Sequence, residues 1–169
     1  MNDKFITFLI MGVAGSGKTT IAKKITEEIN AFLIEADDYH SKNNIKKMSS
    51  GIPLNDEDRY DWLVKIREEI IKRQKTQNLV VTCSALKEKY RSILNVKNYY
   101  LVYLKINKET ARKRINNRRD HFMPDSLVES QFSILEEPKK AITLDQSLNP
   151  DEMVNQLILT FKDSKLKYE

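Results

Sequence analysis

Short apolar runs recur along this chain at intervals that suit a layered α/β fold. They occupy residues 5–11, 31–34, 79–83, 99–104 and 141–144, and each has the length of a buried strand. Polar or amphipathic stretches separate the runs, and each stretch is long enough to hold a helix. The pattern therefore predicts five strands that alternate with helices.

Helical spacing fills the stretches between the strands. Ile21, Ile25 and Ile29 recur every four residues, and an amphipathic face is predicted over 62–71. Further helices are expected at 87–94, 108–116 and 126–135, and from Asn149-Pro150 onward. This alternation predicts an α/β fold, a mainly parallel five-stranded sheet with helices on both faces, in a single domain over residues 1–169.

The loop after the first predicted strand carries the strongest chemical signal. Residues 12–19 read Gly-Val-Ala-Gly-Ser-Gly-Lys-Thr and match the phosphate-binding pattern G-x-x-x-x-G-K-[ST]. The backbone N–H groups of such a loop wrap a polyphosphate, its lysine reaches the outer phosphates, and its threonine hydroxyl serves Mg²⁺. A glycine-rich turn with a solvated lysine is the alternative, but strand, loop and helix follow in the order that a phosphate site requires. We expect ATP at Gly12, Val13, Ala14, Gly15, Ser16, Gly17, Lys18, Thr19 and Thr20.

The composition and the net charge of the chain limit the kinds of binding partner that we expect. The 169 residues carry a net charge of +5, but lysines alternate with acids, and the one dense basic cluster lies at 112–119. We therefore expect solvated faces and an anion site rather than a nucleic-acid surface. No apolar run approaches the roughly 18 residues of a membrane span, and the first residues carry no export signal. With Cys83 as the only cysteine, a cytoplasmic protein is expected.

Two carboxylates follow the second predicted strand, where ligands of parallel sheets bind. Because alternate residues leaving a strand point the same way, Asp37 is expected to face a phosphoryl acceptor while Glu35 supports the metal. Asp38 is expected to point elsewhere. The alternative is that Asp37 and Asp38 only cap a turn. The rest of the polar segment to Arg59 is expected as loop and short helix outside the core.

Several uncommon strings carry a family resemblance. They are Asp37-Asp38-Tyr39-His40, Asn44, Lys47-Met48, Gly51 to Asp56, Asp58-Arg59, Cys83 to Lys87, Tyr90-Arg91, His121-Phe122, Gln131-Phe132 and Leu135-Glu136 with Pro138. Together with the phosphate loop they resemble the gluconokinases over most of the chain. Ser41 departs from the proline common there, which is expected to loosen the local turn without removing a functional group.

The resemblance implies an ATP:gluconate phosphotransferase that makes 6-phosphogluconate, on a fold similar to adenylate and shikimate kinases. It implies that Lys18 stabilises the transferring phosphoryl group and that Asp37 orients or deprotonates the hydroxyl. It further implies Arg59 and Lys87 for the substrate carboxylate, His40, Lys47 and Gln131 for hydroxyls, and Arg114, Arg118, Arg119 and His121 for phosphate charge in a lid at about 116–125. The acceptor segment would span about 37–60. Homodimers are common in the family, so a homodimer is among the expected assemblies.

Three other functions compete. A shikimate kinase would seat its acceptor on three consecutive glycines, and this chain has four glycines and no such triplet. A nucleoside monophosphate kinase would need an arginine-rich acceptor site, but 35–59 holds more acids than arginines. A non-catalytic nucleotide-dependent protein would need a binding module, for which the spare length is missing.

Overall fold

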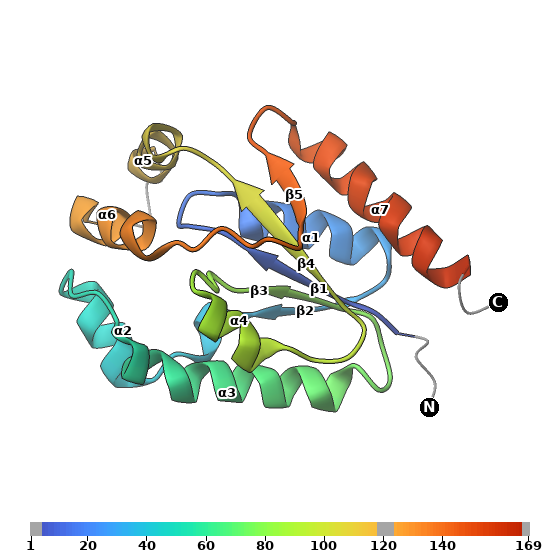
Figure 1. The fold of residues 1–169 in the computed structure, drawn as a ribbon, viewed down its shortest axis with the longest axis horizontal. Coiled ribbons are helices and arrows are strands. Elements are labelled where there is room, and N and C mark those ends of the chain that lie inside the picture. Colours follow the sequence, from blue (N-terminus) through green and yellow to red (C-terminus); the bar gives the residue numbers. More distant parts are fainter. Residues whose placement is uncertain (1–4, 118–123, 167–169) are drawn as a thin grey trace.

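The computed structural model describes residues 5–117 and 124–166 (Figure 1). The elements in chain order are β1 Thr7–Met11, α1 Lys18–Glu28, β2 Phe32–Glu35, the 3₁₀ helix η1 Ala36–Tyr39, α2 Lys42–Ser49, α3 Asp56–Arg73, β3 Leu79–Thr82, α4 Glu88–Leu94, β4 Tyr99–Lys105, α5 Lys108–Asn116, α6 Asp125–Ile134, β5 Ile142–Asp145 and α7 Pro150–Leu166. All five predicted strands are present. No helix in the described ranges is both long and apolar enough to cross a membrane.

The strands form one sheet in the order β2-β3-β1-β4-β5, and every neighbouring pair is parallel. The first strand lies in the centre, with Ile10 opposite Thr82 of β3 and Val102 of β4. The predicted fold class is confirmed. Because all strands run the same way, their carboxyl ends meet at one edge, where the loop after β1 emerges between its neighbours.

Alternate residues of β1 feed two hydrophobic cores, one on each face of the sheet. Leu9 and Met11 pack against α3 and α4, in a core that contains Trp62. Phe8 and Ile10 pack on the opposite face against α1 and α7. Figure 1 shows α3 and α4 on one side of the sheet and α1 and α7 on the other. This explains why β1 is buried at every position and apolar from Phe8 to Met11, since both of its faces are covered.

A smaller core supports the phosphate loop from below. It joins Val13 of the loop to Leu86, Ile106 and Ala111, and Phe132 of α6 packs against it. In Figure 1, α2, α5 and α6 gather beyond the carboxyl ends of the strands. These three helices therefore surround the edge of the sheet at which parallel α/β proteins bind their ligands.

The polar segment 37–59 is more ordered than expected. It forms η1, α2 and the first turn of α3, and it buries Asn44, Leu54 and Arg59. The expectation that it lies outside the core is therefore wrong for these side chains. The third helix begins at Asp56 because Asn55 and Asp58 form a reciprocal capping box.

Ser41 stabilises the start of α2 rather than loosening the local turn. Its hydroxyl accepts a hydrogen bond of 3.1 Å from the backbone N–H of Asn44 and so caps the start of α2. The buried Asn44 amide in turn donates to the carbonyl oxygen of Asp58 at 2.7 Å. The serine thus helps to fix α2 against α3, a task that proline, which has no side-chain acceptor, cannot perform.

Candidate active site

The phosphate loop has the backbone that its glycines permit. Gly17 has a φ of +97° and ends the loop at the first turn of α1, so the helix N-terminus opens toward the loop. Gly15 has a φ of +78°, and a Cβ there would lie 2.9 Å from the carbonyl oxygen of Ala111. Any larger residue at Gly15 would therefore strain the loop and push α5 away.

Two basic side chains lie on this loop. The Lys18 ammonium donates to the carbonyl oxygens of Gly12 and Val13, both at 3.0 Å. Arg114, on α5, donates to the carbonyl oxygens of Gly15 and Ser16 at 3.4 Å each. Both side chains, which were predicted to bind phosphate, therefore lie against the loop. Both bring positive charge to the place where a loop of this type binds anionic oxygens.

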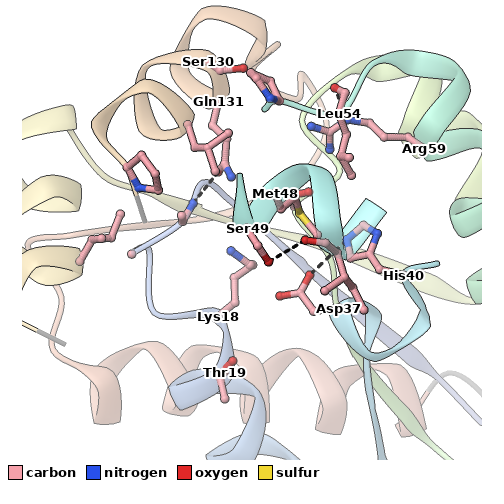
Figure 2. Close-up of a pocket in the computed structure, with 18 of the residues that line it drawn as sticks. Lys18, Thr19, Asp37, His40, Met48, Ser49, Leu54, Arg59, Ser130 and Gln131 are labelled. Atoms are coloured by element: carbon pink, nitrogen blue, oxygen red, sulfur yellow. Dashed lines mark hydrogen bonds and ion pairs between the residues drawn. The ribbon is translucent and has the colours of Figure 1, made fainter. Parts of the chain in front are cut away.

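A pocket of about 430 Å³ opens beside the loop (Figure 2). Its lining comes from the phosphate loop and α1, from η1, α2 and the start of α3, and from α6. Among the predicted site residues, Ala14, Gly15, Gly17, Lys18, Thr19, Asp37, His40, Arg59 and Gln131 line it. Segments that are far apart in the sequence thus converge on one cavity at the predicted edge of the sheet.

The two carboxylates after β2 lie in different places. Glu35 Oε2 accepts a hydrogen bond of 3.4 Å from the hydroxyl of Thr19. Asp37 lines the pocket with its side chain 87% exposed, and Asp38 does not line the pocket. Asp37 therefore lies in the pocket and Asp38 outside its lining, but strand alternation is not the cause: the chain enters η1 at Ala36, so that alternation no longer applies beyond Glu35.

His40 lies at the wall of the pocket in an unusual environment. Its imidazole is stacked on the indole of Trp62, and its side chain is only 5% exposed. Its Nε2 lies 3.9 Å from Asp37 Oδ1, and its buried Nδ1 has no hydrogen-bond partner among the described residues. Burial lowers the pKa of His40, Asp37 raises it, and Arg59 lowers it further. A neutral ring is therefore favoured, with one nitrogen able to donate and the other to accept.

Arg59 is a buried cation at the wall of the pocket. It is 7% exposed, yet its side chain lines the pocket. Its Nε donates to the carbonyl oxygen of Leu54 at 3.3 Å, and its guanidinium carbon lies 5.4 Å from the centre of the Tyr90 ring. These contacts hold the guanidinium at the pocket wall, and a guanidinium is a group that can pair with a carboxylate in a planar fork.

The structure does not bring Lys87 and Lys47 into the pocket lining. Lys87 donates to Asp56 at 3.0 Å, and Lys47 donates to Asp58 at 2.6 Å. Hydrogen bonds from Lys89, Tyr90 and Lys87 hold the pKa of the Asp56 carboxyl well below its ordinary value. Lys87 therefore has a strong partner within the protein, and its predicted contact with substrate would require that ion pair to open.

The apolar part of the pocket was not predicted as a binding surface. Ile45, Met48, Pro53, Leu54, Ile115, Pro124 and Leu127 contribute to its lining, together with the hydroxyls of Ser49, Ser84 and Ser130. Met48, Pro53 and Leu54 occur in the strings that carry the family resemblance, which was the available signal. Ser84 also occurs in one of these strings, whereas Ser49 and Ser130 carry no signal of their own, because isolated serines are common in loops and at helix ends.

Arg118, Arg119 and His121, and most of the lid expected at about 116–125, lie outside the described residues. Cys83 is buried, and burial raises the pKa of its thiol to about 12. It has the properties of a small core residue and not of a nucleophile.

The central phosphate loop, the parallel sheet and the adjoining acceptor pocket define a P-loop small-molecule kinase. A family model described as shikimate kinase matches residues 14–162. The thermosensitive gluconokinase of Escherichia coli is 37% identical over 172 residues, which cover 95% of this chain and 91% of that protein. The gluconokinase of Arabidopsis thaliana is 36% identical over 167 residues, with 88% of each chain covered. The crystal structure of a gluconokinase from Sinorhizobium meliloti matches with a TM-score of 0.84 and 34% identity, over 96% of this chain and 95% of that one.

These similarities extend over nearly the whole chain, and they agree with the strings that line the acceptor pocket. The chain belongs to the gluconokinase family. The resemblance seen in the sequence is thereby confirmed. As a kinase of this class it uses ATP as its phosphoryl donor.

Proposed function

We propose that this protein transfers the γ-phosphoryl group of ATP to D-gluconate and forms 6-phospho-D-gluconate. One observation carries the proposal: a carboxylate, Asp37, and a guanidinium, Arg59, line the same pocket as the phosphate-loop lysine. A sugar acid needs these two groups, one to receive the proton of its hydroxyl and one to bind its carboxylate. The gluconokinase relatives support the same assignment.

Charge stabilisation falls to the phosphate loop. Phosphoryl transfer proceeds in line, with negative charge spread over the transferring oxygens, so most of the catalysis is positioning and electrostatics. The Lys18 ammonium already lies over the loop, and the Arg114 guanidinium lies at its rim. We infer that these cations, with the backbone N–H groups of residues 14–19, bind the phosphates and neutralise the charge that develops.

Proton transfer falls to Asp37. Its carboxylate is 87% exposed and lines the pocket, and although His40 Nε2 lies 3.9 Å from its Oδ1, the carboxylate stays open to a hydroxyl. In the proposed step, the acceptor hydroxyl of gluconate hydrogen-bonds to Asp37, gives up its proton there, and its oxygen attacks the γ-phosphorus while the bond to the β-phosphate oxygen breaks.

Recognition of the acid group falls to Arg59. A guanidinium pairs with a carboxylate in a planar fork, and its contacts with Leu54 and Tyr90 limit the directions it can take. Gluconate would then lie with its carboxylate at the wall formed by α3 and its terminal hydroxyl toward Asp37 and the phosphate loop. The alternatives that lack a carboxylate would leave this cation unpaired.

The residues present fit a Mg²⁺ site of the kind that ATP brings with it. The Thr19 hydroxyl and the Glu35 carboxylate are in contact, which offers one direct oxygen ligand and one acceptor for a metal-bound water. No cluster of three or more metal-ligating side chains occurs in the described part of the chain, so phosphates and waters would supply the remaining ligands. When bound, Mg²⁺ neutralises phosphate charge. The cytoplasmic location and the homodimer suggested by the resemblance stay predictions.

A coupled assay with single acceptors tests the proposed function. Purified protein is given ATP and Mg²⁺ with gluconate, glucose, shikimate or AMP, and ADP release is followed. We expect gluconate to have a kcat/KM at least tenfold above each of the others. Glucose should be poor because it would leave the Arg59 guanidinium without a carboxylate partner. Shikimate is the sharpest competitor, because it carries a carboxylate and the matching family model bears its name. A higher kcat/KM for shikimate would reverse the assignment while leaving the kinase class intact.

A further inference from the structure

Arg59 lines the pocket as a nearly buried cation without a carboxylate partner. None of the ion pairs between described residues includes it, and its Nε donates instead to the carbonyl oxygen of Leu54 at 3.3 Å (Figure 2). Yet three acids, Asp56, Glu57 and Asp58, precede it in the first turn of α3. Asp56 lies three residues earlier, a spacing at which an aspartate and an arginine on one helix readily form an ion pair. The absence of that pair therefore needs a structural cause.

The Asp56 carboxylate is held by three donors at the start of α4. Lys87 donates to its Oδ1 at 3.0 Å, Lys89 donates to its Oδ2, and the hydroxyl of Tyr90 donates to its Oδ1. Tyr90 is buried, and burial and the contact with Asp56 both raise the pKa of its phenol, so the hydroxyl keeps its proton. Both oxygens of the carboxylate are thus engaged by residues outside α3.

Arg59 is left with uncharged neighbours by these contacts. Its guanidinium carbon lies 5.4 Å from the centre of the Tyr90 ring, close enough for attraction between a cation and the face of an aromatic ring. The acid next to it in the sequence, Asp58, is engaged as well: it accepts from Lys47 at 2.6 Å and from the backbone N–H of Asn55 at 3.0 Å. The guanidinium therefore keeps its charge available to a ligand of the pocket.

We propose that Lys87 and Tyr90 are positioning residues that hold the Asp56 carboxylate away from Arg59, so that the guanidinium stays free for the carboxylate of the acceptor. This inference rests on the proposed function, and it gives Lys87 a role through Asp56 in place of the direct contact with substrate that the resemblance implies. Once released, Asp56 pairs with Arg59 and competes with the acceptor. Such competition raises the KM for gluconate and leaves the KM for ATP almost unchanged.

Two variants release Asp56 in different ways. Tyr90→Phe removes the hydroxyl, keeps the ring beside Arg59 and changes no charge, whereas Lys87→Gln removes the ammonium. We expect each to raise the KM for gluconate about three- to fivefold, the competition that an ion pair near the surface of a helix can exert, and to keep the KM for ATP within about twofold. Tyr60→Phe, at an exposed position of α3, is the matched control and should equal the wild type.

Asp56→Asn supplies the decisive comparison, because it removes the competing charge and keeps the shape of the side chain. Combined with Tyr90→Phe or with Lys87→Gln, it should return the KM for gluconate to the value of Asp56→Asn alone. Comparison with Asp56→Asn itself removes any general effect of the lost charge. A lysine that binds the substrate directly would instead keep the KM raised in the double variant of Asp56 and Lys87.

The KM reports on folded molecules only, so a partial loss of stability in Tyr90→Phe would lower the apparent kcat and leave this readout intact. An unchanged KM for gluconate in Tyr90→Phe or Lys87→Gln would overturn the inference, and so would a raised KM that Asp56→Asn does not restore. In these cases the wild type still phosphorylates gluconate, and the proposed function stands. A wild type that leaves gluconate unphosphorylated would overturn the proposed function, and this inference with it.

Discussion

The imidazole of His40 is stacked on the indole of Trp62, with ring centres 4.1 Å apart and planes inclined by 15°. The same indole donates a hydrogen bond of 2.6 Å from Nε1 to the carbonyl oxygen of Ala36. Trp62 therefore holds both ends of the short segment that contains Asp37. A tryptophan in the core of the protein thus positions the carboxylate to which we assign proton transfer.

His40 should make the stability of the protein depend on pH. Its pKa is lowered in the folded state by burial, with Asp37 opposing and Arg59 reinforcing the shift, while Trp62 adds no charge. The unfolded chain then binds more protons than the folded one below about pH 6.5, the ordinary value for histidine. The contribution of the neutral ring to the free energy of unfolding is fully present above that pH and is lost as the pH falls. Urea unfolding of wild type and His40→Gln from pH 7.5 to 5 should give curves that converge on acidification, and parallel curves would contradict this account.

Replacing Lys18 should abolish transfer without unfolding the protein. Its ammonium acts on charge that grows in the transition state, so Lys18→Met should lower kcat by a factor on the order of a hundred to a thousand. Lys23→Met, an exposed change one turn further along α1, is the control and should keep normal turnover. Near-normal kcat in Lys18→Met, measured with saturating ATP and gluconate, would show that the loop does not carry the reaction.

The neighbouring carboxylates Asp37 and Asp38 should differ sharply. Both are exposed, but only Asp37 lines the pocket. Asn keeps the shape and cannot take a proton, so Asp37→Asn should lower kcat roughly a hundredfold, within the range for loss of a general base. Asp38→Asn should stay within about twofold of the wild type. Equal and mild effects would restore the interpretation that the two acids only form a turn.

Arg59 and Lys87 were both predicted to bind the substrate carboxylate, and the structure separates them. Arg59 lines the pocket, while Lys87 is paired with Asp56. Arg59→Gln should raise the KM for gluconate by roughly ten- to a hundredfold, the loss expected for a charged hydrogen bond, and change that for ATP little. Lys87→Gln should raise it by less. The reverse order in steady-state assays would mean that the Lys87–Asp56 pair opens when gluconate binds.

Patterns that depend on neighbouring residues were predictable from the sequence. The five strands followed from short apolar runs, and the phosphate loop from glycines that must adopt positive φ beside a lysine at fixed spacing. Because the predicted sheet was parallel, the loop and Asp37 could also be placed at one edge of it. The two cores were predictable in the same way, because β1 is apolar on both faces from Phe8 to Met11.

Features that depend on contacts between distant segments were not predictable. Nothing in the string around Lys87 reveals that Asp56, 31 residues earlier, holds its ammonium. The stack of His40 on Trp62 likewise joins residues that are too far apart in the sequence to be related by the periodicity of a helix (3.6 residues) or of a strand (2 residues). The burial of Arg59 was missed because a charged residue in a polar segment is ordinarily exposed, and only the folded pocket shows which apolar neighbours enclose it.

The most direct test of the gluconokinase assignment is a competition for limiting ATP. Equal concentrations of gluconate, shikimate, glucose and AMP are mixed with the purified protein, and the products are resolved by ³¹P NMR once the ATP is consumed. The distribution of phosphate reports the ratios of kcat/KM directly, free of differences in saturation. We predict that nearly all of the transferred phosphate appears as the primary phosphate ester of gluconate, 6-phosphogluconate. Phosphate found mainly on shikimate, glucose or AMP would contradict the account.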